Sequence, residues 1–123
     1  MSSGIAWSAS LKTAADRFNK STAVTDGEGS TLTYRELCEQ AHGLSRQLMA
    51  THHAALEKPV ATLLPNRTTA VVASYAIRLT GAIEVPISWA STSEEIAWCA
   101  QLAKVSTVLT LSERKAEIEA LGL

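Results

Sequence analysis

The segment that decides the fold begins with Leu-Thr-Tyr-Arg-Glu-Leu, residues 32–37, and ends with Leu-Thr-Gly-Ala-Ile-Glu-Val-Pro-Ile, residues 79–87. Between these ends a helical pattern, a short apolar run and a second helical pattern follow one another. Buried strands that alternate with helices are typical of an α/β fold with a mainly parallel sheet. Residues 1–31 and 88–123 flank this segment.

The first helical pattern has a clear start. The Thr33 hydroxyl can accept a hydrogen bond from the Glu36 amide while the Glu36 carboxylate accepts one from the Thr33 amide, which is a capping box. We expect Leu32 to pack on Leu37 as the accompanying hydrophobic staple. Apolar residues then recur on one face of the helix, at Leu37, Ala41, Leu44 and Leu48. The pattern predicts a helix lying on a surface of the domain.

The second half of the segment predicts a strand, a helix and another strand. Val60–Leu64 is an apolar run of the kind that a parallel sheet buries on both faces. Asn66 is expected to cap the next helix, Arg67–Thr80, and Gly81 to end that helix in a left-handed conformation. The next buried strand is Ile83–Ile87.

The flanking regions add a hairpin, a third strand and three further helices. The predicted elements are a helix at Ser8–Phe18, β-prone runs at Thr22–Thr25 and Ser30–Leu32, a helix with a capping box of Thr92 and Glu95, a strand at Val105–Leu109 and a helix at Glu113–Leu121 capped by Ser112. The whole is an α/β domain in which helices flank the sheet.

Composition limits the class of protein. The chain has 123 residues, enough for one domain or a piece of one. Its 11 basic and 12 acidic side chains form no runs, which argues against nucleic acid or an anionic membrane as the main partner. No apolar run approaches the ~20 residues that span a bilayer, and residues 1–20 contain no secretory signal pattern. Cys38 and Cys99 are expected to be reduced thiols of a cytoplasmic protein.

The sequence offers no residue set that performs chemistry by itself, so we assign no catalytic, cofactor-binding or metal-ligating residue. His52 and His53 read as a solvated helix end, and Ser74 and Ser88 have no evident His partner. Glu94 and Glu95 are explained by helix capping. Glu84 is the one charge in an apolar strand, and we expect it at a sheet edge or paired with Arg78.

The helix Arg67–Thr80 leaves almost no polar face, and a helix that is apolar all round must be covered all round. We therefore expect part of it to meet another chain, a second copy, or further polypeptide. The interface candidates are Val71, Val72, Tyr75 and Trp89. Trp89 and Trp98 are otherwise expected to pack in the core or at its edge.

Three motifs in register resemble the adenylate-forming (AMP-binding) superfamily of acyl- and aryl-CoA synthetases, peptide-synthetase adenylation domains and luciferases. Residues 32–37 resemble its first core motif, Val60–Asn66 its following strand, and residues 79–87 its second motif. The resemblance covers roughly Leu11–Leu111. The chain departs from it at Arg67-Thr68-Thr69, where many relatives have an acidic residue, and at residues 88–92, which lack a proline common there.

The resemblance implies an enzyme that joins a carboxylate to ATP, releases pyrophosphate, and passes the acyl group to the thiol of coenzyme A or of a carrier-protein phosphopantetheine. It implies ATP, Mg²⁺ and one of these thiols for the complete enzyme, and none of them for this chain alone. In the family, the phosphate-binding loop, the metal-binding carboxylates and a small C-terminal domain lie further along the chain. Residues 1–123 are thus expected to be the N-terminal portion of an adenylation domain, without its ATP-binding loop.

Three hypotheses follow. The first is an N-terminal fragment or split subunit of a carboxylate-adenylating ligase, inert alone, whose partner is the remainder of the enzyme or a complementary chain. The second is a stand-alone module derived from that fold, which docks on a synthetase or carrier protein or forms a homodimer. The third is an unrelated flavodoxin-like domain with a ligand site at the carboxyl ends of its strands. The carboxylic acid and the acyl acceptor are not fixed by these residues.

Overall fold

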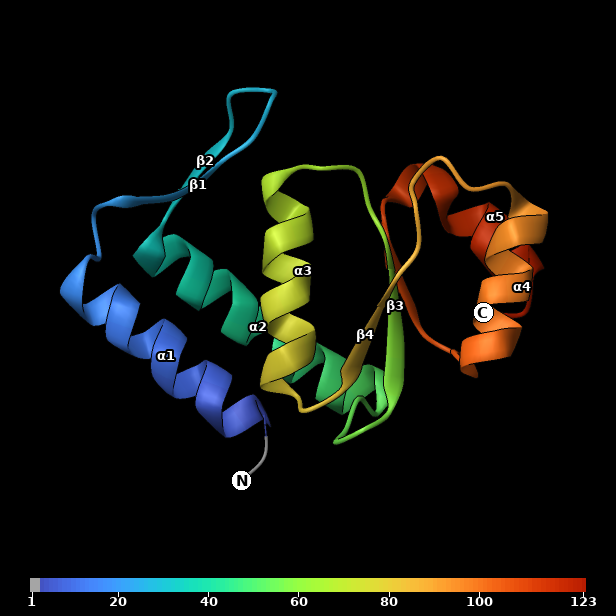
Figure 1. Ribbon diagram of the computed structural model, residues 1–123, viewed down its shortest axis with the longest axis horizontal. Helices are drawn as coiled ribbons and strands as arrows, with labels where there is room; N and C mark the ends of the chain where they lie inside the picture. Colours follow the sequence, from blue (N-terminus) through green and yellow to red (C-terminus); the bar gives the residue numbers. More distant parts are fainter. Residues whose placement is uncertain (1–2) are drawn as a thin grey trace.

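The computed structural model describes residues 3–123 as a sheet between two layers of helices, with an additional hairpin and an outer helix (Figure 1). In chain order the elements are α1 (Ser3–Arg17), β1 (Thr22–Thr25), β2 (Thr31–Thr33), α2 (Tyr34–His52), β3 (Pro59–Leu63), α3 (Thr68–Leu79), β4 (Ile83–Pro86), α4 (Ser93–Ala103), β5 (Val108–Thr110), a 3-10 turn (Ser112–Arg114) and α5 (Lys115–Ala120).

The sheet has the order β4-β3-β5, and both pairs of strands are parallel. Ala61 in β3 is in register with Val85 on one side and with Val108 on the other. β3 is buried along almost its whole length, so the prediction of a strand covered on both faces is confirmed. β1 and β2 form a separate antiparallel hairpin, also as predicted.

Helices cover the two faces of the sheet in different ways. On one face, α2 and α3 pack over Val60 of β3, and α1 adds a further layer outside them. On the other face, Ile96 of α4 and Ile118 of α5 pack over Ala61 and Leu63. Figure 1 shows this division, with α1, α2 and α3 on one side of β3 and β4, and α4 and α5 on the other. The alternation of side chains along a strand sends successive β3 residues into different cores.

Both predicted capping boxes are present. The Thr33 N–H donates to Glu36 Oε1 at 2.9 Å, and the Glu36 N–H donates to Thr33 Oγ1 at 3.1 Å. The hydrogen bond from the Thr33 backbone lowers the pKa of the Glu36 carboxyl. Thr92 and Glu95 form the same reciprocal pair at the start of α4. Leu32 and Leu37 share one buried cluster, as the staple requires.

The N-cap predicted for α3 is wrong, and the reason is tertiary. The N-cap residue is Arg67, whose side chain makes no cap hydrogen bond. Instead the Thr68 N–H donates to Asp26 Oδ2 at 3.1 Å, so a carboxylate from the β1–β2 turn caps α3. An ion pair between Arg67 and Glu28, 3.2 Å apart, lies beside it. The exposed Asn66 is not needed because the hairpin supplies the acceptor.

The third strand begins later than predicted. Val105 is buried, but its N–H donates to the Ala100 carbonyl at 2.9 Å, after Lys104 has taken a left-handed conformation. This closes the end of α4 in the manner of a Schellman motif, so the backbone of Val105 is unavailable for the sheet. The strand β5 therefore starts at Val108 rather than at Val105.

Three terminal predictions also need correction. α1 begins at Ser3 rather than Ser8 and ends before Phe18, which is 50% exposed beside the Tyr34 ring. Ser112 does not cap α5 because a 3-10 turn intervenes, and the N-cap of α5 is Arg114.

The left-handed conformation predicted at Gly81 is confirmed, with φ +82°, and a Cβ there would lie 3.3 Å from Leu56 Cα.

We predict that Asp26→Ala destabilises the protein at neutral pH and that the effect disappears in acid. The Thr68 amide lowers the pKa of the Asp26 carboxyl below its ordinary value of 3.8. A carboxyl whose pKa is depressed by folding contributes stability above its unfolded pKa and loses that contribution as pH falls through the folded value. The melting temperature of Asp26→Ala should thus be a few degrees below that of the parent at pH 7, and should match it well below pH 3.8.

Thermal unfolding followed by circular dichroism between pH 2.5 and 7 measures this difference. Asp26→Asn is the matched control, because its amide oxygen can still accept the hydrogen bond but does not titrate. A constant difference between Asp26→Ala and the parent across this range would contradict the assignment of Asp26 as a charged cap.

Candidate functional site

A hollow of about 500 Å³ lies at the carboxyl ends of β3 and β4. Its walls are the first half of α3, Leu64 after β3, and the loop Ile87–Ala90 after β4. β3 leads into α3 on one face of the sheet, whereas β4 leads into α4 on the other. Adjacent parallel strands whose connections diverge in this way form a topological switch point, where open α/β sheets bind ligands.

Glu84 is the ionisable centre of the hollow. Its Oε2 accepts hydrogen bonds from Thr62 Oγ1 and Ser74 Oγ, each at 2.9 Å. Its Oε1 accepts a hydrogen bond from the Arg78 guanidinium at 2.5 Å, within an ion pair. The Glu84 side chain is 9% exposed and that of Arg78 is 36% exposed. The predicted pair with Arg78 is therefore confirmed, and Glu84 also lies on an edge strand.

These contacts hold the Glu84 carboxylate in one position. Three donors from β3 and α3 hold the carboxylate, and Arg78 also donates to the Ser74 carbonyl at 3.1 Å. The Ser74 hydroxyl donates its hydrogen bond to Glu84, so it has a structural partner. The cluster gives the hollow a rigid polar wall, and the side chains of Leu64, Pro86 and Trp89 give it an apolar one.

Arg114 fixes the loop on the other side of the hollow. Its guanidinium donates to the Trp89 carbonyl at 2.6 Å and the Ser91 carbonyl at 3.0 Å, and lies 5.2 Å from the centre of the Trp89 ring. Glu117 accepts hydrogen bonds from the same guanidinium. That interaction raises the pKa of Arg114 and lowers the pKa of Glu117. Arg114 thus connects the loop after β4 to α5.

The four interface candidates lie in different places. Val72 is buried at 7% exposure, in a cluster with Leu11 of α1 and Leu37 of α2. Val71 and Tyr75 are half-buried against the same cluster. Much of the apolar surface of α3 is therefore covered within the chain, because α1 and α2 lie over it, and Val72 has little exposed surface to offer an interface.

The two tryptophans also differ from each other. Trp89 is half-buried on the opposite side of the sheet from Val72, where it packs against the α4–α5 core and lines the hollow. Trp98 was expected in the core or at its edge, but it is 64% exposed on α4, one turn from Leu102, which is 69% exposed. The α4 stripe contains Ile96 and Ala100, and these leave Trp98 on the solvent side.

The two histidines at the end of α2 and Cys38 lie where the sequence analysis expects them. His52 and His53 are exposed at the end of α2, where His53 is the left-handed C-cap residue. Burial raises the pKa of the half-buried Cys38 thiol. Within residues 3–123, no group of three or more His, Cys, Asp or Glu side chains is placed to hold a metal ion. No helix in this range is both long and apolar enough to cross a membrane.

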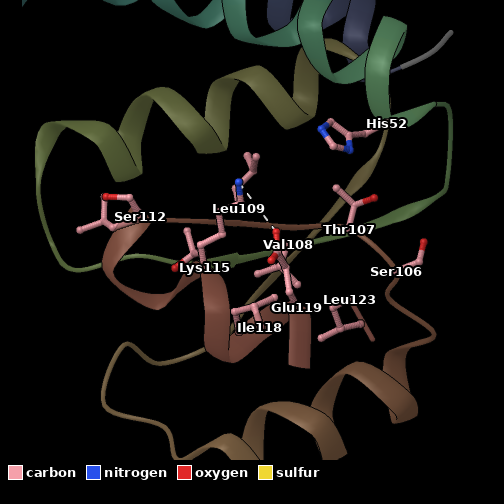
Figure 2. Close-up of a pocket in the computed structure, with 12 residues that line it drawn as sticks. His52, Ser106, Thr107, Val108, Leu109, Ser112, Lys115, Ile118, Glu119 and Leu123 are labelled. Carbon is pink, nitrogen blue, oxygen red and sulfur yellow. Dashed lines mark ion pairs between the residues drawn. The ribbon is translucent and has the colours of Figure 1, made fainter. Parts of the chain in front are cut away.

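A second hollow, of about 540 Å³, was missed from the sequence. It follows the outer edge of β5, from Ser106 to Ser112, between His52 at the end of α2 and the α5 side chains Lys115 and Ile118 (Figure 2). We call it the β5 groove. The sequence does show an apolar strand without a proline or a charge. It does not show which strands lie beside that strand in the sheet, so the groove along its edge could not be predicted.

Comparison with known proteins identifies relatives of this fold. The family model described as AMP-binding enzyme matches residues 11–122. No curated protein matches the chain significantly. Many solved structures do, among them ATP-bound MatB from Rhodopseudomonas palustris, with a TM-score of 0.82 and 22% identity over 99% of this chain and 24% of MatB.

Two further structures show the same likeness. A putative long-chain-fatty-acid CoA ligase from Rhodopseudomonas palustris has a TM-score of 0.80 and 23% identity, over 93% of this chain and 28% of that one. The N-terminal subdomain of Klebsiella oxytoca NpsA, in complex with anthranilyl-AMSN, has a TM-score of 0.74 and 20% identity, over 84% of this chain and 27% of that one. The chain thus spans between 24% and 28% of the length of these structures.

We predict that Glu84→Ala destabilises the protein by about 1–3 kcal/mol, because it leaves the buried Thr62 hydroxyl and the Ser74 hydroxyl without their acceptor. The matched variant combines Glu84→Val with Thr62→Val and Ser74→Ala, which removes the two hydroxyl partners together with their acceptor, while Arg78 loses Glu84 in both variants; it should lie closer to the parent. Urea unfolding of the parent and both variants measures the difference. Equal losses in the two variants would show that the cluster is not a mutually dependent network.

Proposed function

The chain belongs to the AMP-binding enzyme family, and we propose that it is the N-terminal part of an ATP-dependent ligase that adenylates a carboxylic acid. It would act as a fragment or split subunit that is not catalytic alone. The observation that carries this proposal is the family match over residues 11–122, in a chain that spans about a quarter of its structural neighbours.

The geometry supports a structural role for these residues within such an enzyme. The hollow at the switch point has a polar wall whose groups are held by one another and an apolar wall whose loop is held by Arg114. Such a surface can shape one side of a binding site without supplying a reactive group. We propose that the remainder of the ligase completes the site and brings the chemistry.

The N-terminus of α3 does not fit the phosphates of ATP. The N-terminus of a helix that follows a parallel strand is a natural anion site, and α3 is such a helix. Its N-terminus, however, already receives the Asp26 carboxylate, and a phosphate placed there would meet a like charge. We therefore propose that ATP, Mg²⁺ and the acceptor thiol, whether of coenzyme A or of a carrier-protein phosphopantetheine, bind to residues outside this chain. A cytoplasmic location belongs to the same proposal.

The exposed side chains of α4 favour a second candidate, a module that binds another protein. Trp98 and Leu102 are neighbours on one helical face and are both more than half exposed. Aromatic and large aliphatic side chains in this arrangement are common in protein interfaces. The module would dock on a synthetase or a carrier protein, and it would work at the length of the given chain.

We predict that the 123-residue chain alone does not catalyse carboxylate-dependent exchange of pyrophosphate into ATP, whereas the native polypeptide or complex that contains it does. The native species is isolated from its own cells with an antibody raised against the chain, and its intact mass and exchange activity are measured with a panel of fatty and aryl acids. Activity of the 13.1 kDa chain alone would contradict the proposal. A native species of 13.1 kDa without a stable partner and without activity would favour the binding module.

A further inference from the structure

The hollow at the carboxyl ends of β3 and β4 combines one buried charge with a largely apolar lining. Of the described residues that line it, only Glu84 has an ionisable side chain, and Leu64, Pro86 and Trp89 are among the apolar ones. Small-molecule sites usually have this composition, in which a few polar groups on an apolar surface orient the ligand. The volume of about 500 Å³ also lies within the range of such sites, roughly 300–1,000 Å³.

The Glu84 carboxylate can accept a further hydrogen bond. An ionised carboxylate offers about four acceptor positions on its two oxygens. Within the part of the chain that the structure describes, Thr62 and Ser74 both donate to Oε2, whereas Oε1 accepts from Arg78. Oε1 therefore has room for one more donor. Because the Glu84 side chain lines the hollow, a ligand bound there is placed to supply that donor.

Arg78 determines what charge such a ligand can carry. Its guanidinium pairs with Glu84 from outside the hollow, whose lining includes Thr62, Ser74 and Glu84. Since this pair has no net charge, an ammonium group in the hollow would gain little from Glu84 and would lie near the like charge of Arg78. A carboxylate or phosphate would bring a second anionic acceptor to Glu84. A neutral hydroxyl donates to Oε1 without either conflict.

The remaining lining favours a flat apolar group beside this hydroxyl. Trp89 is half-buried, and Arg114 holds it by donating to its carbonyl at 2.6 Å and by lying 5.2 Å from the centre of its ring. Ala70 and Ser74, one turn apart on α3, bring only small side chains to the hollow. An aromatic ligand would thus meet an indole that is already ordered, which lowers the entropy lost on binding.

We infer that this hollow is a binding site for a neutral hydroxylated aromatic ring, a phenol, whose hydroxyl donates to Glu84 Oε1 and whose ring contacts Trp89. The inference rests on the proposed function in that the same hollow forms one side of the ligase's binding site. Its test measures binding to the 123-residue chain and not pyrophosphate exchange, so the two proposals fail separately.

The first test titrates p-cresol into the isotope-labelled 123-residue chain and follows the indole N–H signals by NMR. Anisole is an isomer of p-cresol without a hydrogen-bond donor, benzylamine is a cation of similar size, and benzoate is an anion. We expect p-cresol to shift the Trp89 signal saturably, while the signal of Trp98, which is exposed on α4, does not move. Because the other probes lose the hydrogen bond or meet a like charge, p-cresol should bind more tightly than each of them by about tenfold or more.

Three results of this titration would overturn the inference. The first is a Trp89 signal that p-cresol does not shift to saturation. The second is equal affinity for p-cresol and anisole, which would make the hollow an apolar surface without a role for Glu84. The third is tighter binding of benzylamine or benzoate, which would contradict the role of Arg78. Each of these results leaves the proposed adenylation untouched, because the activity of the native species is measured separately.

A variant pair tests the location. Ala70→Leu places a larger side chain in the hollow and leaves the partners of Glu84 in place. Thr69→Leu adds leucine at the neighbouring exposed position, which is not part of the lining. We expect Ala70→Leu to lose the p-cresol shift of Trp89 and Thr69→Leu to retain it, with circular dichroism confirming that both variants fold. Parental affinity in a folded Ala70→Leu variant would overturn the inference, and the probe series on the parent chain decides it if this variant does not fold.

Discussion

The burial of β3 on both faces is the constraint on which the rest of the structure depends. Its residues alternate between two hydrophobic cores, one formed with α2 and α3 and the other with α4 and α5. A strand in this position has no solvent-facing side, so each face needs its own helical layer. The connections through α3 and α4 supply those layers on opposite faces. Their divergence at the carboxyl ends of β3 and β4 then opens the hollow around Glu84.

Hydrogen bonds and ion pairs between residues far apart in the sequence hold the turns and loops that the hydrophobic layers do not hold. Asp26 caps a helix that begins 42 residues later, and thereby attaches the hairpin to α3. Glu84 draws donors from β3 and α3, and Arg114 connects the loop after β4 to α5. Each of these charges has several partners, and for the buried Glu84 they offset the cost of withdrawing the carboxylate from water. The walls of the hollow are thus set by contacts between distant segments.

The local parts of this fold could be predicted from the sequence, whereas contacts between distant segments could not. The capping boxes at Thr33 and Thr92 were evident because donor and acceptor lie within one turn. The cap of α3 was assigned to Asn66 because the sequence does not show that Asp26 is its neighbour in space. The start of β5 was misplaced for a related reason, since the apolar character of Val105 does not reveal that its N–H closes α4. Burial of Val72 under α1 and α2 also depended on how three helices pack.

The two outer edges of the sheet differ in the residues that lie along them. At β4, Pro86 and the charged Glu84, which is held by its hydrogen-bonding partners, protect the edge of the sheet beside the hollow. At β5, unprotected backbone and half-buried side chains lie between two helical layers that extend to the edge. A self-sufficient domain gains by protecting both edges, because an open apolar edge invites aggregation. Among the described residues this sheet protects the β4 edge alone, so the two edges differ in how readily they could pair with another strand.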